Sequence, residues 1–158
     1  MKYKIINTYL LSSAVVSALL TASSASAQNI FVANWYNPGA IYEFTPGSSP
    51  STYYSGGLGE PEDIAFNSSG DLFVANSSGN AIDEITPGSD PTESSFASIP
   101  DPHGLAFDSA GDLYISGNND GDIYEIKAGT TTVTTFTTGL NTLAGLAFDQ
   151  AGFICVSI

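Results

Sequence analysis

Basic residues are almost absent from this 158-residue chain. It contains no arginine, and its three lysines are Lys2, Lys4 and Lys127. From residue 28 onward, one lysine stands against 16 acidic residues, which gives this part a formal net charge of −15. Because phosphate backbones are bound through Lys and Arg, the composition excludes nucleic acid and anionic membrane surfaces as partners. The acidity fits either a surface that keeps the protein dispersed or acidic loops that recruit cations outside the cell.

Cysteine is nearly absent as well. Cys155 is the only one, so no disulfide can form within the chain. It lies in a short apolar segment close to the C-terminus, and we expect it to be a small core residue.

Long hydrophobic runs are missing except near the N-terminus. Two lysines precede the apolar run 10–20, and Ala25, Ser26 and Ala27 follow it in an A-x-A pattern. This order predicts a signal peptide over residues 1–27 and a mature protein that begins at Gln28. The run is too short, and too interrupted by serine, for a membrane helix. We therefore expect export to the periplasm or the cell exterior, with no membrane insertion after cleavage.

No helical period of 3.6 residues is present after residue 27. Instead, short apolar segments alternate with turns rich in Gly, Pro, Ser and Asn, and they repeat. Phe66, Phe107 and Phe148 are 41 residues apart, and the same spacing separates a set of isoleucines: Ile41, Ile82 and Ile123. Short strands with a period near 40 residues are typical of β-propeller blades. The sequence thus predicts an all-β fold of four-stranded antiparallel blades, with units at about 30–59, 60–100, 101–142 and 143–158.

The turns within these units explain some of their polar residues. Asn67, Asp108 and Asp149 each begin a turn that contains glycine, where a side-chain oxygen can accept N–H bonds from the turn backbone. The stretch 118–122, Asn-Asn-Asp-Gly-Asp, has the composition of a hairpin turn and lacks the spacing of a calcium-binding loop. We therefore predict structural turns at all four places.

The segment 102–115, PHGLAFDSAGDLYI, resembles a repeat of NHL-type propellers and of the SMP-30/gluconolactonase-like superfamily. The resemblance extends over the whole predicted mature chain and implies a six-bladed type of propeller. It does not choose a function, because such propellers include hydrolases, lyases, binding proteins and scaffolds.

The predicted mature chain contains only about three blades, too few to close a ring. An open arc would leave two apolar blade faces in water. Three hypotheses follow: the chain is a fragment of a longer gene product without independent function, two chains pair as a homodimer that completes a propeller, or the arc is stable alone.

The resemblance also suggests a metal site at the mouth of the propeller. Glu62 stands where the lactonase-like family has a metal-binding Glu in E-x-P-x-aromatic, although the proline is missing here. His103 stands where that family has the Asn of P-N-G, and Asp63 and Asp101 lie beside these two positions. The implied cofactor is Ca²⁺ or another divalent cation. The alternative is that these are solvated rim residues.

His103 is the only histidine and therefore the candidate general base. Propeller lyases that act on cyclic peptides also use a histidine at the mouth, so the resemblance admits a lyase beside a metal-dependent lactonase-type hydrolase. The alternative is an exposed turn histidine.

Four aromatic residues near the start of the predicted mature chain form a second candidate site. Trp35, Tyr36, Tyr53 and Tyr54 could stack on a sugar, or they could cap the first blade, which lacks an inner strand. The sequence thus favours a secreted, non-catalytic module that binds a small molecule, a glycan or a protein at its mouth.

Overall fold

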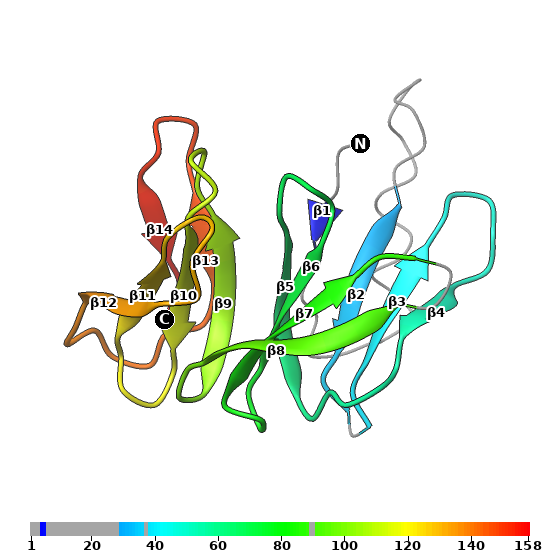
Figure 1. Ribbon diagram of the computed structural model, residues 1–158, viewed down its shortest axis with the longest axis horizontal. Coiled ribbons are helices and arrows are strands. Elements are labelled where there is room, and N and C mark those ends of the chain that lie inside the picture. Colours follow the sequence, from blue (N-terminus) through cyan, green and yellow to red (C-terminus); the bar gives the residue numbers. More distant parts are fainter. Residues whose placement is uncertain (1–3, 6–28, 37, 89–90) are drawn as a thin grey trace.

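Three four-stranded sheets and one two-stranded sheet stand side by side in the order of the chain (Figure 1). The computed structural model describes residues 4–5, 29–36, 38–88 and 91–158, and every element in these ranges is a strand. We name the sheets blades 1 to 4. Blade 1 consists of β1 (Lys4–Ile5), β2 (Ile30–Asn34), β3 (Ala40–Phe44) and β4 (Ser51–Tyr54). Blade 2 consists of β5 (Pro61–Phe66), β6 (Leu72–Asn76), β7 (Ala81–Thr86) and β8 (Thr92–Ser98). Blade 3 consists of β9 (Pro102–Phe107), β10 (Leu113–Gly117), β11 (Ile123–Ile126) and β12 (Val133–Thr137), and blade 4 of β13 (Leu146–Phe148) and β14 (Ile154–Val156).

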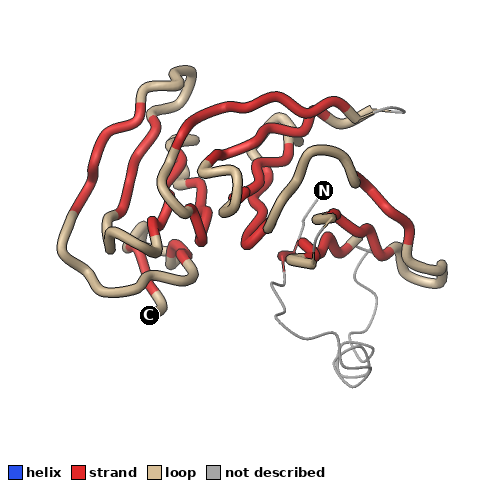
Figure 2. Tube along the Cα trace, turned by 90° about the horizontal axis from the view of Figure 1, so that it is seen from below, coloured by secondary structure: helices blue, strands red, loops and turns tan. Residues whose placement is uncertain are grey.

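Blades 2 and 3 are four-stranded antiparallel meanders, and neighbouring blades form an open arc (Figure 2). The predicted fold class is confirmed: the chain is an incomplete β-propeller. The innermost strands β5, β9 and β13 pack against one another in sequence. Among the residues that the structure describes, blade 1 has no antiparallel inner strand, and β1 pairs in parallel with β2 at that place. This two-residue strand lies inside residues 1–27, the predicted signal peptide. The signal peptide itself stays a prediction.

The phenylalanine that repeats every 41 residues joins each blade to the one before it. The ring of Phe107 packs edge-on against Phe73 of blade 2, with centroids 5.2 Å apart. Phe73 in turn packs edge-on against Phe96 of its own outer strand, at 4.9 Å. The same three-ring arrangement occurs at the other two blade junctions, formed by Phe66, Phe31 and Tyr53 and by Phe148, Tyr114 and Phe136. The repeat seen in the sequence is therefore a repeat of contacts between blades.

The turns at residues 67–71, 108–112 and 149–153 have the structure expected from their sequences. The side-chain oxygen of Asp108 accepts bonds from the backbone N–H groups of Ala110 and Asp112, at 2.8 and 2.9 Å. Asn67 and Asp149 do the same in their own turns. These carboxylates and this amide thus satisfy backbone donors, as predicted for turn residues.

The second strands β6 and β10 are buried along their whole length, because they lie between two blade faces. Apolar clusters fill the three spaces between blades. Gly104 lets blade 3 approach blade 4 closely, since a Cβ there would lie 2.6 Å from the carbonyl oxygen of Ala144.

One packing expectation was wrong. Cys155 is exposed on β14 rather than buried in the core. In the part of the chain that the structure describes, no further sheet covers the outer side of blade 4, so the short apolar segment around Cys155 is only half-buried. Within the same residues, no helix is long and apolar enough to cross a membrane.

Candidate functional site

The residues singled out from the sequence gather at one edge of the arc, which we call the mouth edge. It carries the first residues of β5 and β9 and the turns that join the second strand of each blade to the third. Both inner strands are irregular here: the pairing of β5 with β6 shifts between Pro61 and Asp63, and that of β9 with β10 shifts opposite residues 115–117. β-Bulges commonly redirect side chains beside functional sites. They were not predicted, because the turn signals in the sequence do not report register.

Hydrogen bonds from both neighbouring blades hold Asp101 at the mouth edge. Its backbone is in the left-handed region, with φ of 44°, and its N–H donates to the side-chain oxygen of Asn80 at 2.9 Å. Its carbonyl accepts from the N–H of Asn118 at 3.0 Å, and its carboxylate accepts from the hydroxyl of Ser77. An aspartate in this conformation costs free energy, which these bonds across blades 2 and 3 offset.

His103 faces Asp101. The imidazole Nε2 lies 3.6 Å from the Asp101 Oδ1, and both side chains are about one-fifth exposed or less. A carboxylate at this distance can orient the imidazole ring. The pair has the parts of a general base and its orienting acid.

Glu62 and Asp63 lie within β5 and not in a solvated loop. Glu62 is buried, with 5% of its surface exposed. The two oxygens of Asp63 accept from the N–H groups of Ile64 and Leu105, both at 2.9 Å, so this carboxylate joins the inner strands of blades 2 and 3. Burial raises the pKa of Asp63 to about 6, the backbone bonds oppose that rise, and the charge of Glu62 adds to it.

These side chains do not supply the six to eight oxygens that Ca²⁺ takes. Within residues 4–5, 29–36, 38–88 and 91–158, no three His, Cys, Asp or Glu side chains are grouped so that they could hold a metal ion. The oxygens of Asp63 are already used by the backbone, and Asp101 is bound to Ser77 and faces His103. The metal site predicted from the resemblance remains a prediction without support from this geometry.

The four candidate aromatic residues separate into two pairs. Trp35 and Tyr36, in the mouth-edge turn after β2, are 45% and 76% exposed. Tyr53 instead packs edge-on against Phe31 at 5.1 Å, and the hydroxyl of Tyr54 donates to Glu93 of blade 2. Burial and that bond raise the pKa of Tyr54 above its ordinary value. The first pair is therefore the more exposed of the two, while Tyr53 and Tyr54 are half-buried and hold blade 1 against blade 2.

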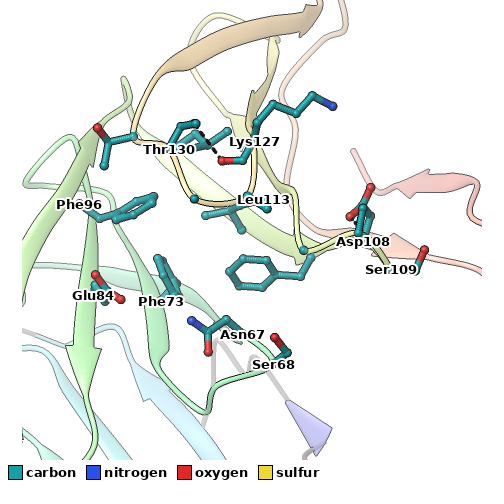
Figure 3. A pocket seen from close by; sticks show the side chains of 17 residues that line it. Asn67, Ser68, Phe73, Glu84, Phe96, Asp108, Ser109, Leu113, Lys127 and Thr130 are labelled. Carbon is teal, nitrogen blue, oxygen red and sulfur yellow. Dashed lines mark hydrogen bonds between the residues drawn. The ribbon is translucent and has the colours of Figure 1, made fainter.

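The structure contains a cavity that the sequence analysis missed. It lies between blades 2 and 3, at the edge opposite the mouth, and has a volume of about 690 Å³ (Figure 3). It is lined by the turns that start at Asn67 and Asp108, by residues 127–131, and by aromatic side chains that the two blades contribute. The pattern of repeats predicts these rings individually, but only the angle between the blades opens a space among them.

Comparison with solved structures identifies the fold. A gluconolactonase from Xanthomonas campestris superimposes with a TM-score of 0.63 at 20% identity, over 77% of this chain and 42% of its own. A chain of the nidogen/laminin complex superimposes with a TM-score of 0.66 at 23% identity, over 75% of this chain and 48% of its own. Virginiamycin B lyase from Staphylococcus aureus superimposes with a TM-score of 0.61 at 16% identity, over 85% of this chain and 50% of its own. No protein-family model matches the chain, and no curated protein does.

All three are β-propellers, so the fold implied by the NHL and SMP-30-like resemblance is confirmed. This chain spans half or less of the length of each of them. At these sequence identities the similarity establishes the fold alone, and it does not assign the activities of these proteins to this chain.

Proposed function

We propose that the protein is an exported β-propeller module that binds a ligand, without catalysis, at its mouth edge. The observation that carries the proposal is the exposed pair Trp35 and Tyr36 on a turn of that edge. Large aromatic side chains that are flat, rigid and amphipathic supply much of the binding energy at recognition surfaces. The polar pair Asp101 and His103, fixed in place on the same edge, adds hydrogen-bonding groups for a neutral, hydroxyl-rich ligand such as a glycan.

Replacing Trp35 or Tyr36 by alanine is expected to weaken glycan binding at least tenfold, the loss typical of a central aromatic contact. The probes are maltohexaose, cellohexaose and chitohexaose, titrated into the purified full chain. Because Trp35 is the only tryptophan, its fluorescence reports contact directly. Calorimetry measures the same affinity in the variants that lack it.

Phe153→Ala is the matched control, since Phe153 is also an exposed aromatic, 69% accessible, but belongs to a turn of blade 4. Its affinity should equal that of the wild type. Failure of all three sugars to change the fluorescence or to produce heat would reject the glycan as ligand, and equal loss in the control would reject the site.

Export is the second part of the proposal and rests on residues 1–27, of which only Lys4 and Ile5 lie in the described part of the chain. The protein recovered from the cell exterior or periplasm should begin at Gln28, as read by N-terminal sequencing. Recovery of the uncleaved chain in the cytoplasm alone would contradict it.

A second candidate function is a lactonase-type hydrolase or a lyase, and the specific observation in its favour is the approach of His103 to Asp101. In that case the protein would open δ-gluconolactone or a cyclic depsipeptide, with or without added Ca²⁺, and His103→Ala would remove the activity. Turnover that depends on His103 would overturn the non-catalytic proposal.

A further inference from the structure

The cavity between blades 2 and 3 has an apolar floor. Phe73, Phe96 and Phe107 form a group of edge-to-face rings, and Leu113 and Ile126 lie beside them. Its volume of about 690 Å³ is within the range of small-molecule sites, which are mostly apolar with a few polar groups that fix orientation. A cavity of this kind takes a compact ligand with an aromatic or aliphatic body.

Glu84 is one of the polar groups that line this cavity. It lies on β7, directly across from Phe73 on β6, and stands beside Phe73 and Phe96 (Figure 3). Its carboxylate has no hydrogen-bond or ion-pair partner among the described residues. Burial raises its pKa, and the neighbouring charge of Asp71 adds to that rise. A partly buried carboxylate without a partner in the protein favours the binding of a cation.

The equivalent glutamate of blade 3, Glu125, lies 41 residues later and is paired with a lysine of the chain. Glu125 accepts bonds from the Lys127 Nζ at 2.7 Å and from the hydroxyl of Tyr114. The same ammonium bonds Asp112 at 2.8 Å, so one lysine bridges two carboxylates. These bonds lower the pKa of Glu125 and of Asp112. In Figure 3 the Lys127 side chain extends away from the cavity.

Blade 2 repeats this arrangement without the groups that complete it. Asp71 and Glu84 stand at the positions of the two carboxylates, but Thr86 replaces the lysine and Phe73 replaces the tyrosine. The amide of Asn67 donates to Asp71 at 2.9 Å and leaves Glu84 unpaired. One ammonium group is thus missing at a place where the neighbouring blade has one.

We propose that the cavity between blades 2 and 3 binds a small organic cation, an arylalkyl- or alkylammonium compound. Its ammonium group pairs with Glu84 as Lys127 pairs with Glu125, and its apolar body rests on the phenylalanine floor.

Charge complementarity selects a cation over a neutral or an anionic ligand. The chain from residue 28 onward carries a formal net charge of −15, and the one lysine near the cavity is already bonded to two carboxylates. Aromatic rings also attract cations through their quadrupole, most strongly where water is excluded. The site is distinct from the mouth edge, so its test is independent of the proposed function.

The test uses the purified full chain and three probes of matched size: 2-phenylethylammonium, neutral 2-phenylethanol and anionic phenylacetate. Saturation-transfer NMR and calorimetry should show saturable binding of the cation, with the neutral probe about tenfold weaker or more and the anion not bound. Equal affinity for the cation and the neutral probe would overturn the proposal.

Two variants locate the contact. Glu84→Gln keeps the shape of the side chain but removes its charge, and Thr86→Lys supplies the missing ammonium from within the chain. Both should lower the affinity for 2-phenylethylammonium at least tenfold, whereas Glu43→Gln, the equivalent change in blade 1, should leave it unchanged. Glu43 already accepts a bond from Asn29 at 2.5 Å. Unchanged affinity in either cavity variant, each verified as folded by its thermal melt, would refute the site.

Discussion

Phe107→Ala is expected to lower the free energy of unfolding by about 3 kcal/mol, the lower end of the range for core phenylalanines because this ring is only half-buried. Phe107 is the ring that blade 3 inserts toward blade 2, where it packs against Phe73 at 5.2 Å. Its loss leaves a hole between two apolar faces that are held by few other aromatic contacts. Urea unfolding, followed by far-ultraviolet circular dichroism, measures the change.

Phe153→Ala is the control for this substitution as well. Phe153 is 69% exposed, so its removal should change stability by no more than about 0.5 kcal/mol. If both variants lose the same small amount, the repeated phenylalanine does not join the blades, and the period of 41 residues reflects the turns alone. If Phe107→Ala has the larger effect, hydrogen exchange should also show faster opening of β9 and β10.

The second large effect is a dependence of stability on pH that arises from Asp63. Its pKa is raised from 3.8 to about 6, chiefly by burial, so the folded state holds a proton more tightly than the unfolded state does. The stability from this group is fully present below pH 4 and is lost as the pH rises through about 6. The shift corresponds to about 3 kcal/mol at neutral pH, as an upper value.

Thermal or urea unfolding of the wild type between pH 4 and 7.5 measures this dependence. Asp63→Asn should make the profile less steep, because an amide does not titrate. Asp83 and Glu84, whose pKa values are also raised chiefly by burial, keep their own contributions in the same direction. An unchanged slope in Asp63→Asn would show that this carboxylate is not responsible. Asp112 and Glu125 act in the opposite direction, since their pKa values are lowered by Lys127, and they lose their contribution only at more acidic pH.

Most strands could be predicted from the sequence. Strands β2, β3, β6, β11, β13 and β14 coincide with short apolar segments that lie between turns in the sequence. The inner strands are longer than their apolar segments at 63–66 and 105–107, because β5 begins at Pro61 and β9 at Pro102. Proline and charged residues normally argue against a strand, but here neighbouring inner strands bury Glu62 and give Asp63 backbone partners.

The candidate site was predicted less well, for a physical reason. The sequence placed Glu62, Asp101 and His103 at one edge of the blades, and they do lie there. Whether their side chains converge depends on bulges and on bonds between blades, such as that from Leu105 to Asp63. Tyr53 and Tyr54 could not be separated from Trp35 and Tyr36 by pattern, because the difference is contact with Phe31 and Glu93.

The sequence by itself determined the strands, the turns and the period, since these depend on neighbours along the chain and on alternation of small turn residues with apolar segments. It also determined the shortage of cations that leaves most carboxylates without an ion-pair partner. The tertiary structure decided which carboxylate lies at a cavity. Glu84 and Glu125 stand at the same position of the repeat, and the sequence has Lys127 beside Glu125 but Thr86 beside Glu84. Only the packing of blades 2 and 3 places Glu84 at an aromatic cavity.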